Sequence, residues 1–301
     1  MNRVRDRFAL AVLAVIAVAA PPLALGDDAL QEILVPGEQW QVAVDGLGFA
    51  DGLSCDRDGN VYFADLRGPG AGVYKLAPDG SKITLASGGR SGTRVGPDGR
   101  LYACGGKTLV AINLVDGRVT PVADGLGTND LAVSSAGFVY ITDTGKKQVT
   151  LVDPRTGKAT AADTGITAPN GIGLSPDHNT LYVSDYGGTH VYAFKVQSDG
   201  TLADRKALMT MKAPENKPTV AGGDGMAIDA AGRLYVTTAV GLQVFDPRNG
   251  ALLGVIPKPG DGPLVSAGFG GKDLDQLYIA CGDKIYRRKT KVKGATPPAP
   301  R

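Results

Sequence analysis

Four residues with oxygen-bearing side chains each stand in front of a short apolar segment, at widely separated points of the chain. They are Asp51, Asn129, Asn170 and Asp224. Carboxylate and amide oxygens are hard ligands that suit Ca²⁺, with other divalent cations such as Mg²⁺, Mn²⁺ or Zn²⁺ as alternatives. Two carboxylates also balance a divalent charge, whereas without a cation Asp51 and Asp224 would repel each other in a confined site. If the fold gathers these four side chains, they form a metal site.

Each of the four residues also has a plainer explanation when it is taken alone. Asp51, Asn170 and Asp224 are each followed by glycine, and Asp-Gly and Asn-Gly are among the commonest turn dipeptides. A turn by itself gives no reason for polar residues to recur at equivalent places of a repeated unit. The elements around the four residues therefore decide between a turn and a site.

One phrase of sequence recurs six times: an apolar strand, a tight turn and a second strand with a tyrosine near its start. Successive tyrosines are separated by 40, 38, 42, 53 and 43 residues, and they are Tyr62, Tyr102, Tyr140, Tyr182, Tyr235 and Tyr278. A third strand follows each pair, and a fourth follows most of them. Four short antiparallel strands in every 40 to 50 residues, roughly, are typical of a propeller blade. The sequence therefore predicts an all-β chain, a six-bladed β-propeller with four antiparallel strands per blade.

The two ends of the chain differ from the repeats. Residues 1–26 combine three arginines with an apolar run, which predicts a secretory signal peptide and export to the periplasm or the medium; an uncleaved anchor is the alternative. The propeller is expected over residues 27–290, closed by an N-terminal strand at residues 39–44 that completes the last blade. The polar, proline-rich residues 291–301 are expected to form a disordered tail.

Blade symmetry brings the four polar residues to one place. When the six copies are aligned on their tyrosines, the residues that begin the innermost strands are Asp51, Ser91, Asn129, Asn170, Asp224 and Ala267. All six then lie around the channel axis at about the same depth, so the aspartates and asparagines are predicted to form a metal-binding ring. Three residues after Ser91, Arg94 is predicted to reach the channel and bind an acidic substrate, with a structural ion pair as the alternative.

The remaining composition narrows the functional classes. The formal net charge is +2, which gives no reason to expect binding to nucleic acid or to an anionic membrane, and a monomer is expected. Two histidines, His178 and His190, do not support a zinc site built on histidine. No G-x-S-x-G motif occurs, which disfavours a serine hydrolase. An odd number of cysteines in an exported protein leaves at least one unpaired, and they are Cys55, Cys104 and Cys281.

The motifs around the ring residues resemble those of the SMP-30/gluconolactonase/LRE-like family of calcium-dependent six-bladed propellers, which are mostly lactonases and related esterases. The likeness covers residues 38–290. Its most specific phrases are Asn129-Asp130 before AGFVYITD, APNG before LSPDHNTLYVSD, and GDGM before AAGRLYV. The resemblance implies that Asp51, Asn170 and Asp224 hold the catalytic cation, and that Asn129 binds either the cation or the substrate.

Two departures from the family pattern concern the ligand set and the substrate. The first-blade ligand is usually glutamate in an E-G-P context, and here it is the shorter Asp51. Sugar-lactone members carry arginine two residues before the blade-three asparagine, where this chain has Gly127, which argues against an aldonolactone substrate.

The resemblance also suggests a reaction. Asp224 is the expected base acting on metal-acidified water, with Asp51 second, and Asn129 is the other expected catalytic residue. The expected function is a metal-dependent lactonase that opens a small lactone or ester. The alternative is a non-catalytic exported propeller of NHL type that serves as a binding platform, which would not need a ring of four oxygen ligands.

Overall fold

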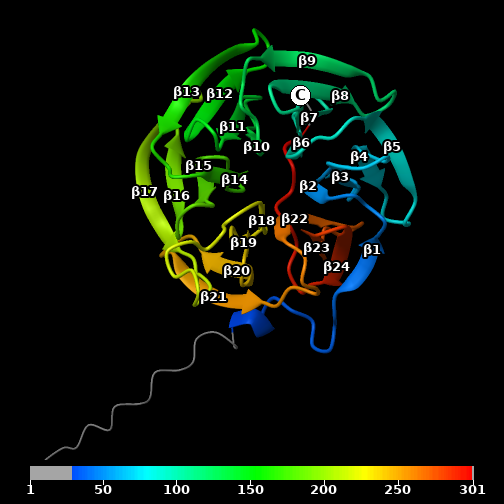
Figure 1. Ribbon diagram of the computed structural model, residues 1–301, viewed down its shortest axis with the longest axis vertical. Helices are drawn as coiled ribbons and strands as arrows, with labels where there is room; N and C mark the ends of the chain where they lie inside the picture. The colour runs from blue at the N-terminus through cyan, green and yellow to red at the C-terminus, as the bar shows by residue number, and fades with distance from the viewer. Residues whose placement is uncertain (1–28, 300–301) are drawn as a thin grey trace, which may run out of the picture.

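Six four-stranded antiparallel sheets stand in a ring around a central channel in the computed structural model, which describes residues 29–299 (Figure 1). In five blades the strands follow chain order from the innermost to the outermost. The strands of the first three blades are β2 Ala50–Cys55, β3 Val61–Asp65, β4 Gly72–Leu76, β5 Lys82–Ser87, β6 Thr93–Val95, β7 Arg100–Cys104, β8 Thr108–Asn113, β9 Val119–Asp124, β10 Leu131–Val133, β11 Val139–Asp143, β12 Gln148–Asp153 and β13 Lys158–Thr164. Those of the last three are β14 Pro169–Leu174, β15 Thr180–Asp185, β16 His190–Val196, β17 Leu202–Thr210, β18 Met226–Ile228, β19 Leu234–Thr238, β20 Gly241–Asp246, β21 Ala251–Ile256, β22 Leu264–Gly270, β23 Gln276–Cys281, β24 Lys284–Lys289 and β1 Gln41–Val44. The six-bladed propeller that the repeats predict is confirmed.

The ring is closed by the N-terminal strand, as predicted. β1 pairs antiparallel with β24, so the sixth blade has the order β1-β24-β23-β22 (Figure 1). This pairing joins the two ends of the repeat array and covers the edge that β24 would otherwise expose. Since β1 is followed along the chain by β2, its pairing with β24 also links the first blade to the sixth.

The recurring tyrosine explains why each repeat forms the same pair of strands. Each tyrosine ring is buried between neighbouring blades, and its cross-strand partner lies on the innermost strand. In three blades the hydroxyl donates to the aspartate of the preceding turn, with oxygen–oxygen distances of 2.8 to 2.9 Å. The apolar ring thus packs the blade interface while its polar end ties the strand to the turn.

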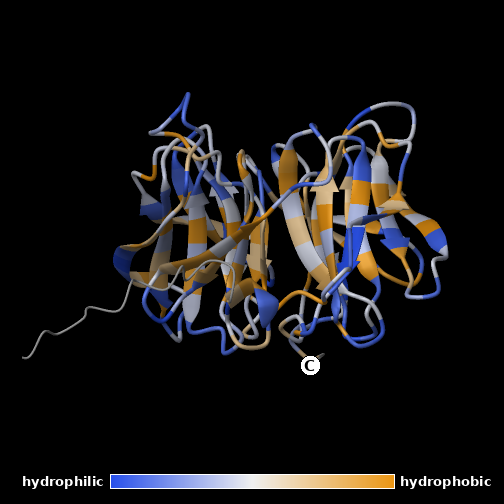
Figure 2. Ribbon diagram, turned by 90° about the horizontal axis from the view of Figure 1, so that it is seen from below, coloured by the Kyte–Doolittle hydropathy of each residue, from blue (hydrophilic) through white to orange (hydrophobic). Residues whose placement is uncertain are grey.

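The apolar core lies between the blades. Six clusters of buried side chains form, and each combines residues of two neighbouring blades, as when Val73 of the first blade meets Leu101 and Ile112 of the second. The edge-on view shows apolar residues along the strands and polar ones in the loops of both faces (Figure 2). Because the apolar faces of the strands are buried between neighbouring blades, polar side chains are found at the channel and at its two mouths.

The segment after β24 follows a defined path, which differs from the disordered tail that its composition predicts. It crosses one mouth of the channel, drawn in red in Figure 1, from the sixth blade across the centre of the ring. Four backbone hydrogen bonds of 2.8 to 2.9 Å hold it, between Lys291 and Ile33, Lys293 and Ala230, Gly294 and Leu274, and Ala295 and Ile228. Gly294 lies so close to Phe269 that a Cβ would overlap it. These long-range partners order a stretch that has no helix or strand pattern of its own.

Deletion of residues 291–301 is expected to lower the free energy of unfolding by about 2 kcal/mol or more, because four backbone hydrogen bonds are lost at about 0.5 to 1.5 kcal/mol each. Urea unfolding of the shortened chain would measure the loss. Removal of residues 299–301 alone keeps all four bonds and serves as the control. Equal stability of the two truncated proteins would contradict this role of the segment.

The predicted signal peptide, residues 1–26, lies outside the described residues. Within residues 29–299, no helix has both the length and the apolar character needed to cross a bilayer. Cys55, Cys104 and Cys281 are all free thiols, and the last two are buried.

Candidate metal centre

The pairing register fixes which residues occupy equivalent places around the channel. The six tyrosines oppose Ser54, Arg94, Ala132, Gly173, Ala227 and Gly268 on the innermost strands. Counting back three residues gives Asp51, Ser91, Asn129, Asn170, Asp224 and Val265. The sixth position is therefore Val265 and not Ala267, which pairs with Ile279 and is buried. The pairing register places the other five residues at equivalent positions of their blades, at one mouth of the channel.

Backbone geometry supports the equivalence of the ring positions. The N–H groups of Asn129 and Asp224 both donate to a threonine carbonyl of the second strand, Thr142 and Thr237, at 2.9 Å. Glycine follows the ring residue in four blades because a Cβ there would overlap the backbone or side chain of the next blade; at Gly52 φ is also +62°. The close approach of the next blade thus explains the glycine of each Asp-Gly and Asn-Gly pair. It does not explain the polar residue before the glycine, whose side chain is available to face the channel.

Blade three carries an aspartate in the slot that glycine fills in its neighbours. Asp130 follows Asn129, where four other blades have glycine and the sixth has Ser266. Its carboxylate accepts the N–H of Leu131 at 2.8 Å and that of Ile172, in the fourth blade, at 3.3 Å. Sequence reasoning missed this residue, although the break in the glycine pattern was the available signal.

Three carboxylates interact electrostatically in this mouth. Burial, opposed by the Gly52 N–H and reinforced by the charge of Asp130, raises the pKa of Asp51 to about 7. Burial, together with the charges of Asp51 and Asp130, raises the pKa of Asp224 well above its usual range. The pKa of Asp130 is raised by burial as well, and the positive charge of Arg94 opposes that rise. Without a cation, the three aspartates disfavour one another's ionised forms.

Asn170 completes this group. Its side chain is buried, its amide stabilises the ionised form of Asp224, and its Oδ1 atom has no hydrogen-bond donor among residues 29–299. A buried amide oxygen without a donor costs free energy, and a hard cation would satisfy it. No set of three acidic, histidine or cysteine side chains within residues 29–299 forms a cation cage alone, so amide oxygen and water would have to complete the coordination. The donor set fits a Ca²⁺-like cation on these terms.

Asn129 lies at the edge of this group. Its backbone carbonyl accepts hydrogen bonds from Gly92 and Ser91 of the second blade, and its half-buried side chain lines a hollow between blades two and three. The side chain makes no hydrogen bond to any of the three aspartates in the described part of the chain. The fold therefore gathers Asp51, Asn170 and Asp224, adds Asp130, and leaves Asn129 on the rim.

Gly127 borders the same hollow, and its lack of a side chain is enforced by the fold. The Asp143 carboxylate accepts the Gly127 N–H at 3.1 Å and occupies the space where a Cβ would stand. Asp143 is itself buried and also accepts the N–H of Lys146 at 2.9 Å. An arginine at this position would have no room unless the Asp143 side chain moved.

Gly127→Ala is expected to destabilise the protein by about 1 to 3 kcal/mol, because the new Cβ overlaps the Asp143 carboxylate. Gly145→Ala, in the same loop region, meets that carboxylate only at 3.6 Å and is the matched control. Urea unfolding compares the two variants. If the added Asp143→Ala substitution fails to offset part of the Gly127→Ala loss, the steric explanation is wrong.

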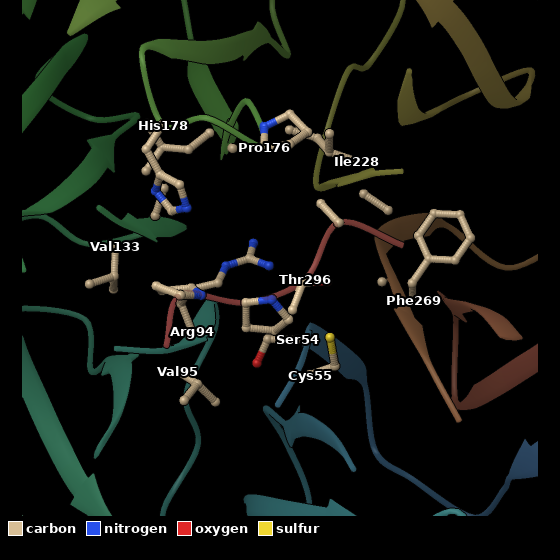
Figure 3. Close-up of a pocket in the computed structure, with 18 of the residues that line it drawn as sticks. Ser54, Cys55, Arg94, Val95, Val133, Pro176, His178, Ile228, Phe269 and Thr296 are labelled. Atoms are coloured by element: carbon tan, nitrogen blue, oxygen red, sulfur yellow. The ribbon is translucent and has the colours of Figure 1, made fainter. Parts of the chain in front are cut away.

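Arg94 and His178 occupy the other end of the channel. Arg94 lies three residues beyond the ring position, about 10 Å along an extended strand. Both line a cavity of about 110 Å³ that the C-terminal segment borders, and Figure 3 shows their side chains directed into it. His178 therefore lies away from the ring residues, and Arg94 lies beyond the acidic group as seen from the ring mouth.

Comparison with known proteins agrees with the fold. The family model described as the SMP-30/gluconolactonase/LRE-like region matches residues 49–282. A gluconolactonase of Zymomonas mobilis is 29% identical over 257 residues, covering 75% of this chain and 72% of that protein. A pentonolactonase of Haloferax volcanii is 29% identical over 157 residues, which is 50% of this chain and 52% of that protein.

Solved structures show the same architecture. A gluconolactonase from Xanthomonas campestris superposes with a TM-score of 0.74 at 24% identity, covering 87% of this chain and 92% of that one. A calcium-binding protein, regucalcin, from Agrobacterium tumefaciens gives 0.74 at 19% identity, covering 88% and 98%. At these identities the superpositions bear on the fold alone. Because the family model spans most of the propeller, from the first ring aspartate to the sixth blade, this chain belongs to the SMP-30/gluconolactonase/LRE-like family.

Proposed function

We propose that this protein is a metal-dependent lactonase that hydrolyses a small lactone or related ester at the ring mouth of its channel. The observation that carries the proposal is that three aspartates at this mouth, Asp51, Asp130 and Asp224, are coupled by their charges, and that the buried Asn170 Oδ1 beside Asp224 has no donor among residues 29–299. Such a group is costly without a cation and well suited to one. The relatives named as lactone hydrolases support the same reaction class.

The proposed ligands are Asp51, Asn170 and Asp224, with Ca²⁺ favoured by the oxygen donors. A divalent cation held there polarises a lactone carbonyl and lowers the pKa of water. Asp130, placed beside the ligands by two backbone N–H groups, adds the third negative charge of the site. Asn129 contributes its amide from the rim, where a substrate seated in the hollow would meet it.

Asp224 is proposed as the base. The Gly225 N–H holds its Oδ1 atom at 2.9 Å, which fixes the carboxylate and leaves Oδ2 to accept a proton from the attacking water. The water oxygen then bonds to the carbonyl carbon, the ring C–O bond breaks, and the proton passes from Asp224 to the departing oxygen. One water is added, and the carboxylate is restored.

A panel of lactones and esters tests the proposal with the metal-free protein, and then with Ca²⁺, Mg²⁺, Mn²⁺ or Zn²⁺ added. Hydrolysis should require a cation and stop with EDTA. Elemental analysis should find about one equivalent of cation per chain after dialysis, and its binding should raise the unfolding midpoint by mass action. Absence of both cation binding and hydrolysis would instead favour the binding-platform function.

A further inference from the structure

The cavity at the channel end opposite the candidate metal centre is lined by one positively charged side chain, that of Arg94. At the level of the tyrosines, five blades place small residues against the channel, and the second blade places Arg94; the small residues are Ser54, Ala132, Gly173, Ala227 and Gly268. The missing side-chain volume leaves the cavity of about 110 Å³. Since one water needs roughly 10 to 15 Å³ of such space, the cavity has room for several waters or an ion of a few heavy atoms.

The Arg94 guanidinium has no hydrogen-bond or ion-pair partner among residues 29–299. Its positive charge acts on Asp130, on the side of the ring mouth, and on the Cys55 thiol of the same cavity. Apolar side chains such as Val95, Val133 and Phe269 form much of the remaining wall (Figure 3). A guanidinium in such surroundings carries five N–H donors in a planar fork that matches a carboxylate or an oxyanion.

His178 presents a second donor to the same cavity. Its Nδ1 atom accepts the N–H of Ser135 at 3.2 Å, and burial lowers its pKa, so the neutral ring carries its proton on Nε2. The φ angle of His178 is +59°, an unusual conformation for a histidine, which the hydrogen bond to the third blade helps to hold. Figure 3 shows the imidazole and the guanidinium facing the same space.

The C-terminal segment closes this end. Residues 295–298 line the cavity, and the Arg57 guanidinium donates to the Pro297 carbonyl at 2.8 Å. A ligand there is thus separated from bulk solvent on one side by the segment and faces the acidic group on the other. The low-dielectric walls strengthen any charge interaction with Arg94.

We propose that this cavity, which we call the Arg94 chamber, binds a small free anion of the carboxylate or oxyanion type, held by the Arg94 fork and by His178 Nε2–H. The site is distinct from the proposed lactone site, because the C-terminal segment forms one of its walls and its donors lie beyond the acidic group. Binding neutralises a guanidinium that has no hydrogen-bond or ion-pair partner in the described part of the chain.

Thermal unfolding with sodium acetate or sodium nitrate, at constant ionic strength with the bulky HEPES anion as replacement, tests the proposal. The wild-type midpoint should rise saturably, by about 2 to 5 °C, as the small anion replaces HEPES. Arg94→Met should abolish the rise, whereas Arg118→Met, which removes an exposed arginine of the same blade, should keep it. The melts are run with Ca²⁺ and with EDTA, so that failure of the metal site and failure of the anion site are told apart.

Arg94→Lys keeps the charge but loses the fork, and it should weaken acetate binding by about tenfold. If Arg94→Met does not fold, the acetate affinity of Arg94→Lys tests the proposal in its place. No anion-specific rise in the wild type, an equal rise in Arg94→Met, or wild-type affinity in Arg94→Lys would overturn the proposal. If the wild type shows no anion-specific rise, the role that remains for Arg94 is to oppose the charge of Asp130.

Discussion

Asp224→Asn is expected to lower kcat/KM for lactone hydrolysis by about 10³-fold or more, because the substitution removes both a metal ligand and the proposed base. The asparagine Oδ1 can still accept the Gly225 N–H, so the local backbone should be unchanged. Steady-state kinetics in saturating Ca²⁺ and calcium binding by calorimetry measure the two losses. Wild-type activity in this variant would refute the assignment of Asp224.

The same substitution has a second consequence that a merely structural aspartate would not show. It removes one of three mutually repelling carboxylates, so the metal-free variant should be more stable than the metal-free wild type. Asp246→Asn, in the same blade, is the matched control: it loses a surface ion pair with Arg248, should cost about 1 kcal/mol or less, and should leave activity intact. A metal-free Asp224→Asn protein less stable than wild type would contradict the repulsion.

The metal-free protein is expected to lose stability as the pH rises from 5 to 8. The folded-state pKa of Asp51 is about 7, above its ordinary value of 3.8. A group whose pKa is raised by folding stabilises fully below its unfolded pKa, and that contribution is lost as the pH rises through the folded pKa. For Asp51 alone the loss is about 3 kcal/mol, and Asp224 adds to it in the same direction.

Urea unfolding in EDTA at several pH values measures this slope. His178 contributes with the opposite sign, because burial lowers its pKa, so the comparison with Asp51→Asn isolates the aspartate. The variant should show a flatter profile than wild type. Since cation binding needs ionised carboxylates, the stabilisation by Ca²⁺ should grow over the same pH range. Identical slopes in wild type and Asp51→Asn would contradict the raised pKa of Asp51.

The regular part of the architecture was predictable from local pattern. Alternating apolar residues, tight turns and one tyrosine per repeat specify each strand pair, and their recurrence specifies the number of blades. The closing strand was predictable for the same reason, since Gln41–Val44 resembles the outermost strand of another blade. Three ring residues, Asp51, Asn170 and Asp224, followed from symmetry alone.

The tertiary structure decided what symmetry could not. The β22–β23 hairpin is longer than its equivalents, because Gly268 precedes its paired tyrosine by ten residues whereas Ser54 precedes its own by eight, and this moves the sixth ring position to Val265. Asp130 joins the site only because the next blade supplies the Ile172 N–H. The path of residues 291–298 depends on partners near residues 33, 57, 228 and 274, far away in sequence.

The sequence by itself determined the strands, the blade count and the polar type of the ring, because these depend on neighbours within one repeat. The number of acidic groups in the mouth, the rim position of Asn129 and the enclosure of Arg94 were decided only when six blades and the C-terminal segment came together. Those features depend on contacts between blades. Where the backbone of one blade approaches that of the next, only glycine fits, and charged side chains from different blades come to share one cavity.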